Sequence, residues 1–375
     1  MKTDTDKKRR SRAYICHTYY HIYVTVLKEL AGGEAFARDK ADLFLSKMSD
    51  EILSPDLYER LTASGIFSNV SYLDEKKESN FPWLQKYKNP HASFFKKMCN
   101  RMAYARELPK AMASFIQTDF SVYNDVYVYC DEDPIAYYLN HKKISYHALE
   151  DGLDCVVYCD VIINDDSRFL KLKMFLARRG LIFLPNGYSK YALDMEVNDL
   201  SRIKYPHKGW KEEPRENYVK KLTSEDRERL VRLFIPNLEA LRATCKKASV
   251  SFSEDNAAPS ADGAFLLLTQ PLCDLVTRKR IFEDIIREYA KGAPVIIKPH
   301  PRDVLDYKKE FSSCLILDPY FPIEVLNFCE GIHFQTVMSV MTTAIDTIEF
   351  ADNKINLGWS YLDPYEDPAL HTYEN

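Results

Sequence analysis

Glycine is scarce in this chain. Only 11 of the 375 residues are glycine, no two of them form G-x-G, and the pattern G-K-[ST] does not occur. Classical dinucleotide dehydrogenases and P-loop nucleoside triphosphatases build their phosphate-binding loops on those glycine patterns. The sequence therefore excludes both classes, and any phosphate that this protein binds must be held in another way.

An excess of charge and long apolar runs are also missing. Lys and Arg number 51 against 55 Asp and Glu, a balance that gives no support to a general nucleic-acid binder. No run approaches the ~18 apolar residues of a membrane span. Residues 1–12 are charged and lack the apolar core of a secretory signal. Nine cysteines without C-x-x-C spacing are typical of reduced thiols. We expect a cytoplasmic protein without a metal site.

One segment is both basic and amphipathic. Residues 168–184 carry Lys171, Lys173, Arg178 and Arg179 among large apolar side chains. A helix of this kind can lie on an anionic membrane surface. It can also pack on its own domain, with the lysine stems along apolar surface and the ammonium groups in water. Both interpretations stay open at this stage.

Apolar runs rich in β-formers alternate with helical patterns in the first part of the chain. We predict helices at 20–30, 54–64, 92–118 and 134–140, and strands at 13–16, 41–46, 70–73, 126–130 and 144–149. Such alternation is typical of a parallel sheet covered on both faces. Residues 160–248 have mainly helical or irregular patterns.

The α/β pattern restarts after a polar linker at 251–263. We predict helices at 275–289, 322–327 and 341–349, and strands at 264–268, 295–298, 314–317, 331–335 and 354–357. The fold class is thus α/β, with two Rossmann-like parallel-sheet domains, 1–250 with a helical extension and 263–375. We expect them to face a central cleft, where ligands of open α/β sheets commonly bind.

The first candidate for chemistry is Glu150-Asp151-Gly152, which follows a predicted strand. Neighbouring carboxylates raise the pKa of one of them, which suits a general base near neutral pH. A solvated acidic turn would have the same sequence.

The second candidate is Lys298-Pro299-His300-Pro301-Arg302, directly after an apolar strand. Two prolines stiffen this loop and restrict the direction of the imidazole. A histidine between basic residues can bind a phosphate or give a proton to a phosphate leaving group. The alternative is a rigid turn whose basic residues are merely solvated.

Two predicted helix starts are the third candidate. Pro322 suits a first helical turn, from which Glu324 projects, and Thr342 and Thr343 precede an apolar helical pattern. Hydroxyl and backbone N–H groups at a helix start can bind phosphate without glycine. Ordinary capping explains the same residues.

Taken in order, these motifs resemble the GT-B-type bacterial sialyltransferases, the group of the glycosyltransferase family 52 lipooligosaccharide sialyltransferases and the bacterial polysialyltransferases. The opening segment 14–21, a strand that runs into a histidine-bearing loop, resembles the same group. The resemblance implies an acceptor-side domain at 1–250 and a nucleotide-sugar-binding domain at 263–375. It implies inverting transfer of sialic acid, or a related ulosonate, from a CMP-sugar to a glycan or glycolipid acceptor. The product would be capsule polysaccharide or lipooligosaccharide, and no cofactor is implied beyond the donor.

The resemblance also implies roles for single residues. Asp151 would be the general base, Glu150 its support, and His300 the general acid or phosphate partner. Glu324 would contact the cytidine. The other assigned positions are, for the nucleotide, Lys298, Pro301, Thr269, Gln270, Thr342 and Thr343, and, on the acceptor side, His17, Thr18 and His21.

A metal is not obligatory in this chemistry, because CMP departs with a single phosphate. Asp131-Glu132-Asp133 spells the D-x-D metal motif of another glycosyltransferase fold. It runs straight into Pro134 and a predicted helix, however, and acidic residues favour a helix N-terminus for electrostatic reasons.

Three other functions remain open from the sequence alone. They are a GT-B enzyme that uses a UDP-sugar, a CDP-polyol phosphotransferase, and a degenerate GT-B domain that binds a partner. A homodimer and peripheral membrane contact through 168–184 are further expectations.

Overall fold

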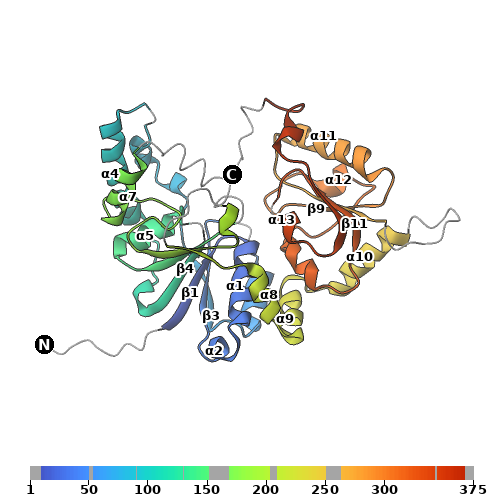
Figure 1. The fold of residues 1–375 in the computed structure, drawn as a ribbon, viewed down its shortest axis with the longest axis horizontal. Helices are drawn as coiled ribbons and strands as arrows, with labels where there is room; N and C mark the ends of the chain where they lie inside the picture. Colours follow the sequence, from blue (N-terminus) through green and yellow to red (C-terminus); the bar gives the residue numbers. More distant parts are fainter. Residues whose placement is uncertain are drawn as a thin grey trace. The chain divides into compact units, whose positions relative to one another are not determined.

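The computed structural model forms two compact units, Met1–Asp226 and Arg227–Asn375, each built on a parallel sheet (Figure 1). They are called here the N-terminal and the C-terminal unit. The residues that the structure describes are 10–49, 54–89, 91–129, 131–151, 169–202, 209–250, 263–342 and 344–367.

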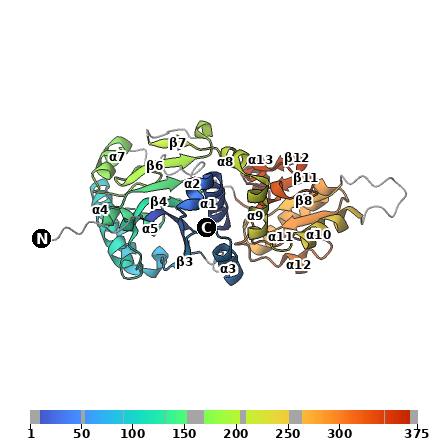
Figure 2. The ribbon, with the colours of Figure 1, turned by 90° about the horizontal axis from the view of Figure 1, so that it is seen from below.

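The described strands of the N-terminal unit form a 7-stranded sheet in the order β3-β2-β1-β4-β5-β6-β7, with β3 and β7 at opposite edges (Figure 2). Every pairing between these strands is parallel. The bounds are β1 Arg10–Cys16, β2 Asp42–Ser46, β3 Asn69–Leu73, β4 Tyr123–Tyr129, β5 Tyr146–Leu149, β6 Ala192–Val197 and β7 Trp210–Glu212.

Helices cover this sheet on both faces. They are α1 Tyr19–Ala31, α2 Gly33–Arg38, α3 Pro55–Ala63, α4 Phe94–Met112, α5 Pro134–Lys142, α7 Leu170–Arg178 and α8 Arg215–Lys221, with short 3₁₀ turns η2 Glu78–Asn80, η3 Pro82–Tyr87, η4 Phe120–Val122 and η6 Leu200–Arg202. Successive side chains of a strand point to opposite faces. Ile15 of β1 accordingly packs in one core with Leu108 of α4 and Leu139 of α5. Its neighbour Tyr14 donates a hydrogen bond to Glu29 of α1 at 2.9 Å.

The described strands of the C-terminal unit form a 5-stranded sheet in the order β10-β9-β8-β11-β12, again with parallel pairings. The strands are β8 Phe265–Leu268, β9 Val295–Lys298, β10 Leu315–Ile316, β11 Phe334–Ser339 and β12 Ala351–Asn356. The helices are α9 Ser224–Phe234, which begins in the first unit, α10 Leu238–Val250, α11 Leu275–Ile285, α12 Tyr307–Glu310 and α13 Ala344–Thr347, with a π turn η7 Ile286–Ala290 and 3₁₀ turns η8 Ile323–Phe328 and η9 Trp359–Leu362.

The predicted fold class, α/β with two parallel-sheet domains, is confirmed. The compact units divide between Asp226 and Arg227, so most of α9 and all of α10 group with the second sheet rather than with 1–250. Residues 251–262 of the predicted linker lie outside the described residues. The mainly helical or irregular pattern assigned to 160–248 was wrong at two places, because β6 and β7 extend the first sheet there. The predicted helix at 322–327 is the 3₁₀ turn η8.

A buried ion pair joins β1 to α1 in the N-terminal unit. The Arg12 guanidinium donates to both carboxylate oxygens of Glu29, at 2.9 and 3.0 Å, and the two side chains are 8% and 2% exposed. Because Tyr14 donates to the same carboxylate, Glu29 accepts hydrogen bonds from two buried side chains at once.

We expect Glu29→Ala to lower the free energy of unfolding by about 3 kcal/mol, since it leaves a guanidinium buried without its counter-charge. Urea denaturation followed by circular dichroism measures this loss. The exposed Glu34→Ala of α2 is the matched control and should stay within about 0.5 kcal/mol of the wild type. A loss below roughly 1 kcal/mol for Glu29→Ala would contradict the role given to the pair.

Candidate active site

Polar side chains of the N-terminal unit gather at one edge of its sheet. In a parallel sheet the carboxyl ends of all strands lie at the same edge, where ligands of open α/β folds bind. The chain places a polar residue at or just beyond five successive strand ends: His17, Ser46, Glu75, Asp131 and Glu150-Asp151.

Asp151 is held by an imidazole. The Nε2 atom of His21, in the first turns of α1, contacts a carboxylate oxygen of Asp151. The backbone N–H of His17 donates to Nδ1 of His21 at 3.0 Å. Since Nδ1 is an acceptor, a neutral His21 carries its proton on Nε2 and donates it to Asp151. The His21 ring also stacks on Tyr129, with ring centroids 4.3 Å apart.

Thr18 acts locally in this arrangement. It is the N-cap of α1, and its hydroxyl oxygen accepts from the backbone N–H of His21 at 3.2 Å. The cap fixes where α1 begins and with it the position of the His21 ring. The three residues predicted for the acceptor side, His17, Thr18 and His21, thus lie together with the predicted base, Asp151.

A second pair of a histidine and a carboxylate lies beside the first. His17 Nε2 is 2.7 Å from Glu75 Oε2, and His17 Nδ1 is 3.5 Å from Asp133. Glu75 also accepts from the Ser46 hydroxyl at 2.7 Å and from the Ile135 N–H, at the start of α5, at 2.8 Å. Glu75 therefore ties the end of β2 and the start of α5 to the loop after β1.

The carboxylates keep His17 charged. Burial lowers the pKa of His17, but Asp133 and then Glu75 outweigh it and raise the pKa to about 9. Burial also raises the pKa of Asp133 above its usual range, although His17 opposes this. An imidazolium is therefore the form of His17 that stabilises the cluster near neutral pH.

Glu75 did not appear among the candidates from sequence. Its signal was available, because it follows the predicted strand 70–73 as Asp151 follows 144–149. The sequence alone does not show whether such a residue is solvated, and the structure shows that Glu75 is only 1% exposed.

Glu150 is buried and bonds to backbone. Its carboxylate accepts from the N–H of Asn198 at 2.5 Å, and its own N–H donates to the carbonyl of Glu196 at 2.9 Å. Glu150 thus joins the end of β5 to the loop after β6. Its predicted role as support for Asp151 stays a prediction.

The D-x-D segment does not present two carboxylates to one point. Asp131 is buried and accepts from the N–H groups of Asn186 and Gly187, the latter at 3.0 Å, and from the Tyr146 hydroxyl at 3.1 Å. Burial raises its pKa to about 6, against those hydrogen bonds. Asp133 turns instead towards His17. Asp131 therefore acts as the acceptor that orders the Asn186–Gly187 loop.

His300 occupies the equivalent edge of the C-terminal unit, after β9. Its N–H donates to the hydroxyl of Thr269, after β8, at 3.3 Å, and the N–H of Thr269 donates to the Lys298 carbonyl at 3.2 Å. The N–H of Arg302 donates to His300 Nδ1 at 3.1 Å, so a neutral ring has its proton on Nε2. Burial, then Arg302 and Lys298, lower the pKa of His300 to about 3. The neutral ring can therefore donate its Nε2–H to an anion bound at this edge.

A buried ion pair braces the His300 loop. Arg278 of α11 donates to Asp303 at 2.6 Å and to the Leu272 carbonyl at 2.6 Å. The other Asp303 oxygen accepts from the Tyr307 hydroxyl at 2.6 Å, and the Asp303 N–H donates to the carbonyl of His300 at 3.0 Å. Hydrogen bonds to both side-chain and backbone groups therefore hold the loop in place.

Lys298, the last residue of β9, and Glu324, at the start of η8, interact electrostatically. The Lys298 ammonium donates to the Pro319 carbonyl at 2.8 Å and lies 4.6 Å from the centre of the Phe321 ring. Burial raises the pKa of Glu324, at the start of η8, while Lys298 lowers it. Both side chains are buried, and Lys298 is the charge that partly balances Glu324.

The other predicted nucleotide positions are at the same strand ends. Pro301 is half-buried next to His300, and the Thr342 hydroxyl accepts from the N–H of Ala344, the first residue of α13, at 3.3 Å. Gln270 is buried, and its side-chain oxygen has no hydrogen-bond partner in the described part of the chain. Thr343 lies outside the described residues.

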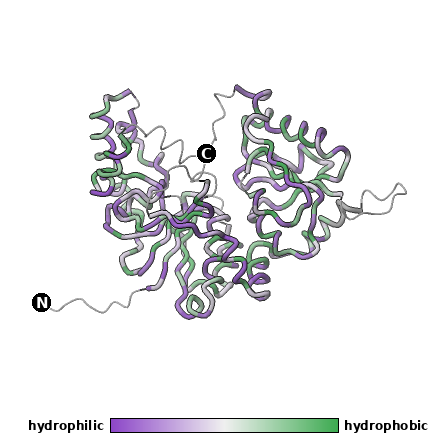
Figure 3. Tube along the Cα trace, in the orientation of Figure 1, coloured by the Kyte–Doolittle hydropathy of each residue, from purple (hydrophilic) through white to green (hydrophobic). Residues whose placement is uncertain are grey.

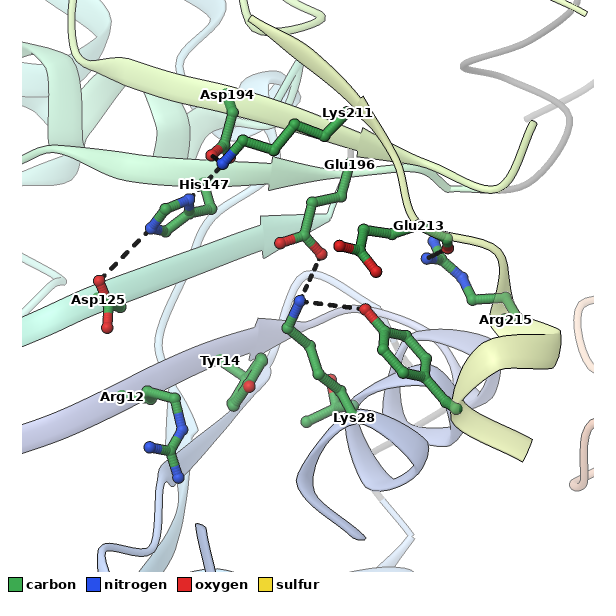
Figure 4. A network of polar contacts seen from close by, with 12 residues as sticks. Arg12, Tyr14, Lys28, Asp125, His147, Asp194, Glu196, Lys211, Glu213 and Arg215 are labelled. Atoms are coloured by element: carbon green, nitrogen blue, oxygen red, sulfur yellow. Dashed lines mark hydrogen bonds and ion pairs between the residues drawn. The ribbon is translucent and has the colours of Figure 1, made fainter. Parts of the chain in front are cut away.

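A third polar network lies within the N-terminal sheet rather than at its carboxyl edge (Figure 4). His147 of β5 is 2.7 Å from Asp194 of β6, and ligand atoms of His147, Asp194 and Glu196 lie within 4.8 Å of one another. Lys211 pairs with Asp194, and Lys28 with Glu196 at 2.5 Å. Each of these two carboxylates therefore already has an ammonium group as its partner, and His147 lies between Asp194 and Asp125.

The architecture is that of the GT-B glycosyltransferases. The structure of the α/β-galactoside α-2,3-sialyltransferase from Photobacterium phosphoreum is similar, with a TM-score of 0.53 at 12% identity, over 93% of this chain and 91% of that one. The GT-B domain of the Photobacterium damselae sialyltransferase has a TM-score of 0.50 at 11% identity, over 92% and 89%. The 2,6-sialyltransferase of Photobacterium sp. JT-ISH-224, solved with CMP and lactose, has a TM-score of 0.52 at 11% identity, over 92% and 71%.

The chain belongs to glycosyltransferase family 52, whose model matches residues 73–357. It is therefore a glycosyltransferase, and the resemblance that its motifs suggested is confirmed. Among curated proteins it is similar to an uncharacterised protein of Haemophilus influenzae, with 32% identity over 102 residues. That match covers 24% of this chain and only 33% of the relative.

The charge state of His17 gives a pH dependence of stability. A pKa raised from 6.5 to about 9 on folding stabilises the protein fully below pH 6.5, and the contribution disappears as the pH rises through 9. We therefore expect His17→Asn to be more destabilising at pH 6 than at pH 9.5, by about 3 kcal/mol. Urea denaturation at the two pH values measures the difference.

The control for this prediction is His333→Asn, because His333 is an exposed histidine on the other unit that pairs with an exposed carboxylate, that of Asp352. Equal destabilisation by His17→Asn at both pH values would show that the ring is held by packing rather than by its charge.

Proposed function

We propose that this glycosyltransferase transfers sialic acid, or a related ulosonate, from a CMP-sugar to a glycan acceptor with inversion. The observation that carries the proposal is the hydrogen bond by which His21 orients Asp151 at the carboxyl edge of the N-terminal sheet. A carboxylate so held, and 24% exposed, can take a proton from an acceptor hydroxyl. Membership of family 52 and the CMP and lactose bound by a similar enzyme support the donor and the acceptor class.

The reaction consists of one displacement. Asp151 removes the proton of the acceptor hydroxyl as its oxygen forms a bond to the anomeric carbon of the donor. The bond from that carbon to the phosphate oxygen breaks, and its electron pair leaves with CMP. The Nε2–H of His300 donates to this phosphate, where negative charge develops. The charge on the phosphate raises the proton affinity of His300, so the same ring can then protonate the leaving group.

The nucleotide would be held by the C-terminal unit without a glycine loop. Thr269 and Thr342 offer hydroxyl groups at neighbouring strand ends. The buried amide oxygen of Gln270 has no hydrogen-bond donor among the described residues, and the nucleotide could supply one. Glu324 would accept from the sugar or base of cytidine. Thr343, adjacent in sequence to Thr342, would supply a second hydroxyl group to the phosphate.

The proposal includes the setting of the reaction. We propose that the enzyme acts in the cytoplasm on capsule or lipooligosaccharide precursors, without a metal cofactor, as a homodimer, and with membrane contact through 168–184. No helix in the described ranges is long and apolar enough to cross a bilayer.

The proposed roles separate catalysis from binding. We expect Asp151→Asn to lower kcat by about 10²–10⁴-fold, the range of general-base catalysis, with CMP affinity unchanged. His300→Ala should lower kcat by about 10²-fold or more and weaken CMP binding as well. Acceptor-dependent CMP release and CMP titration measure these effects.

Asp56→Asn, an exposed aspartate in the first turn of α3, is the control for Asp151→Asn and should keep the wild-type rate. Transfer at the wild-type rate by Asp151→Asn or His300→Ala would remove the proposed mechanism.

The donor nucleotide is tested by ligand stabilisation. We expect CMP to raise the melting temperature, because a ligand present at ~100 times its Kd stabilises the folded state by about 2.7 kcal/mol. UMP and UDP are the comparison ligands in the same thermal-shift experiment. Stabilisation by UDP without stabilisation by CMP would identify a UDP-sugar as the donor and overturn this proposal.

A further inference from the structure

The face formed by α4 and α7 of the N-terminal unit exposes large apolar side chains. The two helices lie side by side, and the rings of Phe94 and Phe169 are 4.7 Å apart (Figure 1). Along α4, hydrophobic and hydrophilic residues alternate (Figure 3). The apolar side chains exposed on this α4–α7 face are Phe95 at 81%, Phe169 at 52%, Phe175 at 51%, Leu172 at 44%, Leu181 at 43% and Met102 at 39%.

One side of α7 packs on the N-terminal unit, and the other side is exposed in the described chain. Lys173 and Ala177 are buried, and Leu170, Met174 and Leu176 are partly buried against the core. Leu172 and Phe175, on the remaining surface of the helix, stay exposed. The helix therefore packs on its own domain and still presents large apolar side chains to its surroundings.

The charge on this face is mainly positive. Residues 169–184 contain four basic side chains and no Asp or Glu, and α4 contains a single acidic residue, Glu107, which pairs with Arg106 and Lys110. Lys96, Lys97 and Lys171 are exposed beside the phenylalanines. The Arg179 guanidinium lies 4.4 Å from the centre of the Phe175 ring, so charge and aromatic surface are in direct contact.

A cavity of about 630 Å³ opens within the same face. Its basic lining residues are Arg106, His141, Lys143, Arg179 and Lys190, and none of the described residues that line it is acidic. Four of these side chains carry a permanent positive charge, so the cavity attracts an anion.

The cavity is continuous with the exposed apolar surface. Met102, Leu181 and Arg179 belong both to its lining and to the α4–α7 face. A ligand that fills the cavity with an anionic group therefore has apolar side chains directly beside it. An anionic phospholipid has this combination, whereas a free sugar phosphate offers nothing for Phe95 or Phe175 to contact.

We propose that the α4–α7 face docks on an anionic phospholipid surface and that the cavity receives the phosphate of one lipid head group. The exposed phenylalanines enter the interfacial region of the bilayer, and the basic residues around them pair with lipid phosphates. This site rests on the membrane contact proposed for 168–184, and it is independent of Asp151 and His300.

Vesicle flotation of the full chain tests the docking. We expect binding to vesicles of phosphatidylcholine mixed with phosphatidylglycerol and at least tenfold weaker binding to phosphatidylcholine alone. The double variant Phe95→Ser/Phe175→Ser should bind the anionic vesicles at least tenfold more weakly. Its matched control is Val276→Ser/Val304→Ser, which removes apolar side chains that are 80% and 78% exposed on the C-terminal unit. The control should bind as the wild type does.

A second pair of variants tests the cavity. Arg179→Gln/Lys190→Gln should lose most of the preference for anionic vesicles, while the exposed pair Lys291→Gln/Lys308→Gln should keep it. Inorganic phosphate and glycerol phosphate are added as competitors. Binding of these soluble anions without binding to anionic vesicles would overturn the proposal, as would flotation of the phenylalanine variant at the wild-type level.

The failure of this inference is distinguishable from a failure of the proposed function. Transfer by the wild type to a soluble acceptor is measured without vesicles. Absence of transfer would contradict the proposed function and leave a positive flotation result standing. Active enzyme that does not float with anionic vesicles would overturn the docking site alone.

Discussion

The parallel direction of the strands is the constraint on which both candidate sites depend. The carboxyl ends of all strands of a parallel sheet lie at the same edge. Residues that follow different strands and are far apart in sequence therefore become neighbours there. His17, Glu75 and Asp151 meet in this way after β1, β3 and β5. Thr269 and His300 meet after β8 and β9 in the second unit. The loops that follow these strands then only have to hold the side chains at this edge.

Both units use the same device to set a histidine. In His21 and in His300 a backbone N–H donates to Nδ1, which leaves the proton of a neutral ring on Nε2. The electrostatic surroundings then differ. His21 faces the carboxylate of Asp151, whereas His300 lies between the positive charges of Lys298 and Arg302. One ring therefore orients an anion that is part of the protein, and the other is suited to an anion that arrives with a substrate.

The sequence predicted those parts of the fold whose strands are apolar. It predicted the candidate sites where polar residues follow such strands. β1, β4 and β9 are runs of this type. The strands β6, with Asp194 and Glu196, and β7, with Lys211, were missed because they carry charged side chains, which pair with each other and with Lys28. Such strands look irregular until their partners are known. Glu75 and Asp131 show the same limit, since whether an acidic residue is solvated or buried depends on donors supplied by distant segments.

The amphipathic pattern of α7 has the same limit for apolar residues, because the sequence does not show which of them are buried. Sequence shows that one side of the helix is apolar, but burial depends on what the rest of the fold places against it. Here the fold packs Leu170, Met174 and Leu176 against its core and leaves Phe175 and Leu172 exposed. A cluster of exposed aromatic side chains loses contact with water only when something outside the described chain covers it. Because most of the charged residues beside the cluster are basic, a partner with negative charge and an apolar interior would complement it.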